Sequence, residues 1–272
     1  MKITSNSYQL PYVYAIAGHV ELSNSANKPI IVTAIDTLTG SKGDYVVKLN
    51  ASERMHKEAR LREILAAFIA MEMELQVVEP AVIEISQEFI NSQRGKDYYL
   101  KASKSLGYNV GSKYIKDYPI LDNSIAFTPN QEQAAQNIFA FDLLIQNSDR
   151  NYEKPNMITD GNDLVMLDHE LAFGFYFVPS FLRAGEPWCF AATDMSWINK
   201  HCLLKRLKGK YYELDYFSER MTNLNDDFWI KVEDKMPREW FDREIFDSIK
   251  THVNLIVAHK EEFIKNIKIL LS

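Results

Sequence analysis

The spacing of apolar residues changes after roughly the first hundred positions, and this change constrains the fold more than any other feature. Before it, short segments rich in β-branched and aromatic residues alternate with turns that contain Gly, Asn and Ser. One longer segment, Glu53 to Leu75, has helical spacing, and Ser52 is a suitable N-cap for it. We therefore expect a small antiparallel sheet with one main helix. The expected strands are Tyr12–Ala17, Pro29–Ile35, Asp44–Leu49, Val77–Ile85 and Asp97–Lys101.

Helical patterns dominate the rest of the chain. The sequence Thr128-Pro-Asn-Gln131 combines an N-cap Thr, a Pro at the first helical position and a Gln that can reach back to the cap. It predicts a helix from Pro129 to about Gln146. Two short helices are expected around 187–199 and 212–222, and Pro237 should open a long amphipathic helix that continues to about Leu271.

The two patterns meet at Ser103 to Tyr108, where Ser-Leu-Gly interrupts both. We therefore expect an α+β fold with two lobes. Residues 1–104 would form the small sheet lobe with its main helix, and residues 105–272 a mostly helical lobe.

Composition excludes several classes of protein. Hydrophobic residues make up 46% and charged residues 25% of the 272 positions, which is ordinary for a folded globular chain. The sequence shows no membrane-spanning or targeting segment, and two cysteines are too few for a disulfide framework, so we expect a cytoplasmic protein. The net charge of −6 argues against broad affinity for nucleic acid or an anionic membrane, although a local basic patch can exist within that total.

A short stretch in the second half gathers polar side chains that suit a chemical site. The turn signal Asp160-Gly-Asn162 is typical of a two-residue hairpin turn, so Asn156–Thr159 should pair with Asp163–Leu167. Pairing places Asn156 and Asp168 at the same open end of the hairpin.

These side chains have the chemistry that phosphoryl transfer needs. Mg²⁺ typically takes one or two oxygen ligands from protein, which Asn156 and Asp168 could supply. Asp149, which enters from the preceding loop, could accept the proton of an attacking hydroxyl. The alternative is a surface hairpin with polar turn residues.

A basic residue in the first half has two interpretations. Lys48 ends a half-buried strand, and Glu63 on the following helix lies on a side with small residues, so a Lys48–Glu63 pair is expected. In a phosphotransferase, such a Lys holds nucleotide phosphates. Alternatively, Lys48 extends to solvent at the strand end and Glu63 makes an ordinary surface pair.

The segment from Glu21 to Lys28 is a candidate phosphate-covering loop. Its backbone amides and the hydroxyls of Ser23 and Ser25 could bind an anion. The segment contains no glycine, so a plain polar hairpin loop is the alternative.

Together these motifs resemble a known family. Lys48 and Glu63, followed by Asn147-Ser-Asp-Arg-Asn-Tyr-Glu-Lys-Pro-Asn156 and then by Val165-Met-Leu-Asp-His169, resemble the HipA-like kinases, relatives of the protein and phosphoinositide kinases. The resemblance covers nearly the whole chain. It implies a two-lobed, protein-kinase-like fold that binds ATP and Mg²⁺.

The resemblance also implies a role for each matching position. Asp149 would be the catalytic base, and Asn156 and Asp168 would be the metal ligands. Lys48 would contact the phosphates with Glu63 as its partner. Asp149 and Asn156 are 156 − 149 = 7 positions apart, whereas the protein-kinase pattern spaces the corresponding residues five apart.

Neighbouring residues have roles that the sequence leaves open. Arg150 could bind a nucleotide phosphate or anchor the loop by pairing with a carboxylate. For Asp142, inside the expected helix, a structural hydrogen bond to the catalytic loop is favoured over chemistry.

The expected function is ATP- and Mg²⁺-dependent transfer of phosphate to a Ser or Thr hydroxyl of a protein. One alternative is a nucleotide-binding interaction module without turnover, suggested by the longer loop and by the lack of glycine in the phosphate loop. A lipid or small-molecule kinase is a further alternative, although an acidic chain without a basic amphipathic helix makes a membrane lipid less attractive.

Overall fold

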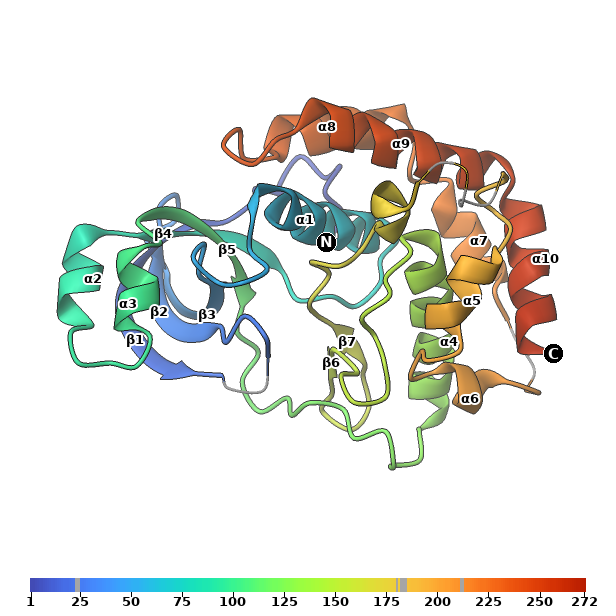
Figure 1. The fold of residues 1–272 in the computed structure, drawn as a ribbon, viewed down its shortest axis with the longest axis horizontal. Coiled ribbons are helices and arrows are strands. Elements are labelled where there is room, and N and C mark those ends of the chain that lie inside the picture. Colours follow the sequence, from blue (N-terminus) through green and yellow to red (C-terminus); the bar gives the residue numbers. More distant parts are fainter. Residues whose placement is uncertain (23–24, 180, 182–184, 211–212) are drawn as a thin grey trace.

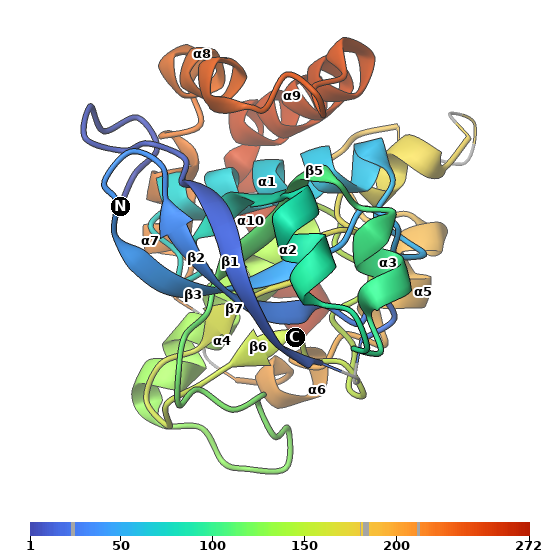
Figure 2. The same ribbon diagram turned by 90° about the vertical axis from the view of Figure 1, so that its left-hand side faces the viewer.

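The computed structural model describes residues 1–22, 25–179, 181, 185–210 and 213–272. Five strands close into a small barrel in the order β1-β2-β3-β5-β4, at the left of Figure 1 and facing the viewer in Figure 2. Neighbouring strands are antiparallel except β1 and β4, which pair in parallel, so the expectation of a wholly antiparallel sheet is wrong at this one pair. The strands are β1 (Tyr12–Glu21), β2 (Ile30–Asp36), β3 (Lys42–Lys48), β4 (Pro80–Ile85) and β5 (Gly107–Lys113).

The barrel has its own hydrophobic core. Val13, Val32, Val47 and Ile83 point inward from four of the strands and are buried together. Gly111 of β5 lies so close to β3 that an added Cβ would come within 2.2 Å of the Val46 carbonyl oxygen. The close approach explains why a residue without a side chain occupies this position.

Helices form most of the remaining structure (Figure 1). Among the described residues, none of them is long and apolar enough to cross a membrane. They are α1 (Lys57–Glu72), α2 (Gln87–Ser92), α3 (Tyr99–Ser103), α4 (Pro129–Leu144), α5 (Ala192–Ile198), α6 (Leu204–Leu207), α7 (Asp215–Met221), α8 (Asp226–Lys235), α9 (Arg243–Ala258) and α10 (Lys260–Leu271), with a short 3₁₀ helix, η1 (Gly174–Phe177).

Helix α1 joins the barrel to the helical part. It is buried along most of its length, and Leu65 and Phe68 belong to the same hydrophobic core as Phe139 of α4 and Phe263 of α10. A helix that is apolar on all sides needs packing partners on all sides. The main helix of the first hundred residues is therefore part of the larger core, and Figure 1 shows it at the centre of the molecule.

Several expected elements are confirmed. The α4 helix begins with the predicted capping box, in which Thr128 accepts from the Gln131 amide and the Gln131 side chain accepts from the Thr128 amide. Helix α5 lies within 187–199 and α7 within 212–222, although residue 212 itself is outside the described residues.

Other expectations are wrong. Residues 97–101 do not form a strand; most of them belong to α3, because Tyr98 and Ala102 pack against the barrel core at helical spacing. The fifth strand is β5, at the predicted break, and it hydrogen-bonds with β3 and β4. Helix α1 begins at Lys57 rather than Glu53, because the Ser52 hydroxyl donates to the Asn27 carbonyl and does not cap the helix.

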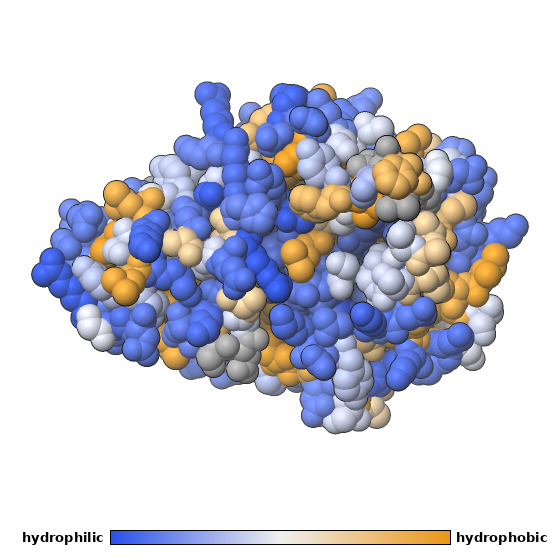
Figure 3. Space-filling view, viewed as in Figure 1, coloured by the Kyte–Doolittle hydropathy of each residue, from blue (hydrophilic) through white to orange (hydrophobic). Residues whose placement is uncertain are grey.

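The C-terminal region also differs. The expected single helix from Pro237 to Leu271 is two helices, α9 and α10, which are separated at His259. Helix α8 precedes them and has a regular N-cap, in which Asn225 accepts from the Phe228 amide. The face shown in Figure 3 is mostly hydrophilic, with apolar residues in separate small groups. The division into lobes at residues 104 and 105 stays a prediction.

Candidate active site

The predicted hairpin forms and places two of the candidate residues side by side. Strands β6 (Met157–Ile158) and β7 (Val165–Met166) pair antiparallel, and the Leu167 amide donates to the Asn156 carbonyl at 3.0 Å. Asn156 and Asp168 therefore lie at the same open end. The connecting loop is longer than the expected two-residue turn, because the Asp160 carboxylate accepts from the amides of residues 162 and 163.

The backbone at these two positions is unusual. Asn156 has a φ of 46° and Asp168 a φ of 61°, both in the left-handed region. Among residues with side chains, Asn and Asp enter this region most readily. Backbone strain of this kind is often found at functional sites.

Lys48, at the end of β3, joins the barrel to this hairpin. Its Nζ lies 2.6 Å from Asp168 Oδ1 and 3.0 Å from Glu63 Oε2 of α1. All three side chains are largely buried. The predicted Lys48–Glu63 pair is confirmed as a contact, and the alternative that Lys48 extends to solvent is excluded.

A third carboxylate, Glu170, contacts Lys48 and was not among the residues predicted from the sequence. Glu170 Oε2 lies 3.2 Å from Lys48 Nζ and also accepts a hydrogen bond from the side-chain amide of Asn27. Glu170 follows Asp168 by two residues, which was the only local signal available. Nothing in the sequence connects it with a lysine on a distant strand, so only the tertiary structure reveals the contact.

Lys48, Glu63, Asp168 and Glu170 together form the Lys48 cluster. Burial and charge shift the pKa values of its carboxyl groups in different directions. Burial, the largest cause, raises the pKa of Glu170 to about 7; Lys48 opposes this increase, whereas Asp168 and Glu63 add to it. Burial also raises the pKa of Glu63 above its ordinary value. For Asp168, burial acts in the same direction, but the charge and hydrogen bond of Lys48 outweigh it, and the pKa of Asp168 is lowered.

Asp149, the candidate base, lies half-buried on the loop before the hairpin. Burial raises its pKa and Asp168 raises it further, whereas Lys154 and Arg54 oppose the increase. A raised pKa makes the carboxylate a stronger proton acceptor.

Arg150 anchors the loop between Asp149 and Asn156 through buried contacts. Arg150 is 1% exposed, and its guanidinium contacts Asp142 at 2.5 Å, the carbonyls of Pro155 and Asn156, and the His169 ring. Asp142 also accepts from Asn147 at 3.0 Å, which confirms its structural role. The attraction of Arg150 and hydrogen bonding with His201 outweigh the effect of burial and lower the pKa of Asp142 to about 2.

These contacts decide between the two roles left open for Arg150. The guanidinium is directed to groups within the protein, so the geometry favours the anchoring role. We therefore do not propose Arg150 as a phosphate ligand.

The candidate phosphate loop is described only in part. Ser23 lies outside the described residues, and the carbonyl of Ser25 accepts from the Lys28 amide at 3.0 Å. The end of the loop is fixed, because the carbonyls of Asn27 and Lys28 accept hydrogen bonds from Lys101 Nζ at 3.1 and 3.3 Å. Together with the contact from Asn27 to Glu170, this brings the loop next to the Lys48 cluster.

The donor set is compatible with a single hard cation. Within the described residues, no three His, Cys, Asp or Glu side chains are grouped to hold a metal. Mg²⁺ requires fewer protein ligands than that, and an amide and a carboxylate suffice. Among the described residues, the buried side-chain nitrogen of Asn156 has no close hydrogen-bond partner, although the Asn156 side chain interacts with the Asp149 carboxyl and lowers its pKa.

Comparison with known proteins gives the family. Residues 39–266 match the sequence model of the HipA-like kinases. A search of curated proteins found no match. Among solved structures, the chain is similar to the proinflammatory kinase CtkA of Helicobacter pylori, with 12% identity, 93% of this chain and 96% of that chain covered, and a TM-score of 0.48. Since the family match includes most of the chain, this protein belongs to the HipA-like kinase family.

Proposed function

We propose that this protein is an ATP- and Mg²⁺-dependent kinase that transfers phosphate to a Ser or Thr hydroxyl of a protein. One observation carries the proposal: the ion pair between Lys48 of the barrel and Asp168 of the hairpin. It joins a candidate phosphate ligand to a candidate metal ligand across 120 residues of sequence. Family membership supports kinase chemistry in general.

Each residue in the cluster has a task in this proposal. Lys48 would bind nucleotide phosphates through its ammonium group, and Glu63 would hold the ammonium in position. The backbone amide of His169 donates to Glu63 at 2.7 Å, which fixes the carboxylate relative to the hairpin. Positioning and charge neutralisation are the main contributions of a protein to phosphoryl transfer.

Asn156 and Asp168 would hold Mg²⁺, which supplies charge neutralisation at the phosphates when it is bound. Asp149 would orient the acceptor hydroxyl and accept its proton. Its raised pKa supports this role, because a weakly basic carboxylate would be a poorer acceptor.

The proposed location is the cytoplasm. Cys189 and Cys202 are both unpaired, which supports a reducing compartment.

The decisive experiment is the Asp149→Ala variant. We expect transfer of radiolabelled phosphate from ATP to protein acceptors, or to the kinase itself, to be abolished. Stabilisation by ATP and Mg²⁺ in a thermal shift assay should persist, because Asp149 is not assigned to nucleotide binding. Asp97→Ala is a matched control, since Asp97 is an exposed carboxylate near α3. Undiminished transfer by Asp149→Ala would refute the assignment.

The same assays separate the alternatives. Stabilisation by ATP and Mg²⁺ without any transfer by the unmodified protein would favour an interaction module without turnover. The spacing of seven positions between Asp149 and Asn156 (156 − 149) motivates that alternative. Transfer to a small hydroxyl compound or lipid but to no protein would indicate a different acceptor class.

A further inference from the structure

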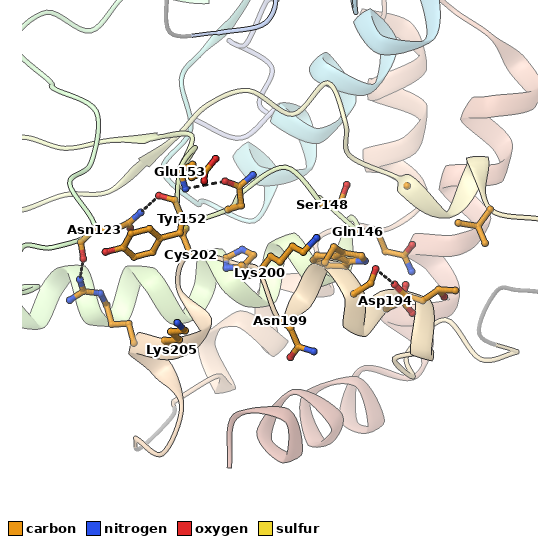
Figure 4. Close-up of a pocket in the computed structure, with 18 of the residues that line it drawn as sticks. Asn123, Gln146, Ser148, Tyr152, Glu153, Asp194, Asn199, Lys200, Cys202 and Lys205 are labelled. Atoms are coloured by element: carbon orange, nitrogen blue, oxygen red, sulfur yellow. Dashed lines mark hydrogen bonds between the residues drawn. The ribbon is translucent and has the colours of Figure 1, made fainter.

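A groove of about 1280 Å³ lies on the outer side of the candidate catalytic loop (Figure 4). Ser148, the residue immediately before Asp149, lines one side of it, and residues of α5 and α6 line the other. The lining residues of the groove do not include Lys48, Asn156 or Asp168. Asp149 is not among the lining residues either, so the groove adjoins the candidate catalytic loop through Ser148, Asn151 and Glu153.

The wall of the groove is connected directly to the catalytic loop. The Cys202 amide donates to the Arg150 carbonyl at 3.1 Å, and Asn151 forms an antiparallel bridge with His201. His201 also contacts the buried Asp142 at 2.9 Å. A molecule bound in the groove would consequently be held in a defined position relative to the loop.

The groove is basic although the chain is acidic. Among the residues that the structure describes, its lining contains four Lys or Arg side chains and two carboxylates, whereas the whole chain has a net charge of −6. The four cations are Lys200, Lys205, Arg206 and Lys210, and the carboxylates are those of Glu153 and Asp194.

The cations of the groove are not equally available. Lys210 pairs with Glu132 at 2.8 Å, and Arg206 donates to the carbonyls of residues 123 and 125. Lys200 and Lys205 are exposed, and in the part of the chain that the structure describes their ammonium groups make no ion pair. Asp194 does not neutralise them, because it is 9% exposed and accepts from the Ala191 amide at 2.8 Å.

We propose that this groove binds an acidic segment of the protein acceptor and presents its hydroxyl to Asp149. The inference rests on the proposed function and adds the substrate class. Lys200 and Lys205 would contact Asp or Glu residues that flank the acceptor Ser or Thr. Trp197 also lines the groove, and its indole would provide an apolar contact for the peptide backbone.

Binding can be measured without turnover. The probe is a fluorescent peptide with a central Ala in place of the acceptor Ser and Glu residues on both sides, with Lys-flanked and Gln-flanked peptides for comparison. Fluorescence anisotropy should show the tightest binding for the Glu-flanked peptide, and added salt should weaken it. The variant Lys200→Glu/Lys205→Glu should weaken this binding about tenfold.

Two controls make the measurement specific. Lys96→Glu introduces the same charge reversal at an exposed lysine between α2 and α3, at the opposite end of the molecule in Figure 1, and should leave binding unchanged. Circular dichroism of the double variant should match that of the unmodified protein, which excludes misfolding. The milder double variant Lys200→Gln/Lys205→Gln should give a smaller loss in the same direction.

Kinetics then distinguish failure of this inference from failure of the proposed function. With Ser-containing peptides, the double variant should raise KM for the Glu-flanked peptide and leave kcat nearly unchanged. Equal binding of the three peptides, or preference for a single-stranded RNA over the Glu-flanked peptide, would overturn the inference even if transfer occurs. Absence of transfer to any acceptor, with preferential binding of the acidic peptide, would instead overturn the proposed catalytic function.

Discussion

Glu170→Gln should remove a pH-dependent loss of stability that is built into the Lys48 cluster. The Glu170 side chain is almost fully buried, and burial, with smaller contributions from Asp168 and Glu63, outweighs the lowering by Lys48 and raises the pKa of Glu170 from 4.5 to about 7. Below 4.5 the carboxyl is protonated in both the folded and the unfolded state. Between pH 4.5 and about pH 7, Glu170 loses its proton in the unfolded chain but keeps it in the folded protein, so the free energy of unfolding falls as pH rises.

The structure gives the size of this effect. A shift from 4.5 to about 7 corresponds to about 3 kcal/mol of stability that is lost above pH 7. Gln retains an oxygen that can accept from Asn27 and Lys48 but carries no charge, and Lys48 keeps Glu63 and Asp168 as partners. The free energy of unfolding of the variant should therefore exceed that of the unmodified protein by about 3 kcal/mol near pH 8, and by less than about 1 kcal/mol near pH 5.

Urea unfolding followed by circular dichroism at about pH 5 and about pH 8 measures the difference. Glu88→Gln is the control, because Glu88 is an exposed residue of α2 with the same chemical change. Its stability should change little at either pH. If Glu170→Gln and the unmodified protein lose stability equally between the two pH values, the reasoning about Glu170 is refuted.

Two further substitutions test the scaffold of the site. Arg150→Ala leaves the buried Asp142 without its closest cation and should lower the free energy of unfolding by about 3 to 5 kcal/mol, measured by urea unfolding; a loss below about 1 kcal/mol would contradict the anchoring role. Thr128→Ala removes the N-cap of α4 and should cost about 1 kcal/mol, seen as a lower Tm, with phosphate transfer per folded molecule unchanged. Thr128→Ser should retain most of the stability, and an equal loss in both variants would argue against the cap.

Local signals predicted the elements whose hydrogen bonds close within a few residues. The start of α4 followed from Thr128 and Gln131, and the 157–166 hairpin followed from the Asp-Gly-Asn turn. In both cases the partners lie close in sequence, so the side chains that satisfy the backbone are visible in one short window.

Predictions failed where a distant surface decides the conformation. Residues 97–101 contain aromatic side chains that favour a strand, but Tyr98 and Ala102 pack on the barrel only when the segment is helical. The break expected at Ser103 to Tyr108 is the entrance to β5, whose hydrogen bonds go to β3 and β4. Packing against other elements overrides local preference in such segments.

In the candidate site, too, some features could be predicted from the sequence and others depend on contacts between distant residues. The order of Lys48, Glu63, Asp149, Asn156 and Asp168 along the sequence was enough to indicate kinase chemistry and to predict the Lys48–Glu63 contact. The inward direction of Arg150 could not be predicted, because it depends on Asp142 and on carbonyls that approach only when the loop has folded.

The sequence by itself determined the residue types of the site, the start of α4 and the hairpin that joins Asn156 to Asp168. Tertiary structure alone decided that Glu170 joins Lys48 and that a basic groove lies beside Ser148, the residue before Asp149. The physical reason is that charge interactions act over a few ångströms of space. Such distances between remote residues exist only once the barrel and the helices have packed around α1.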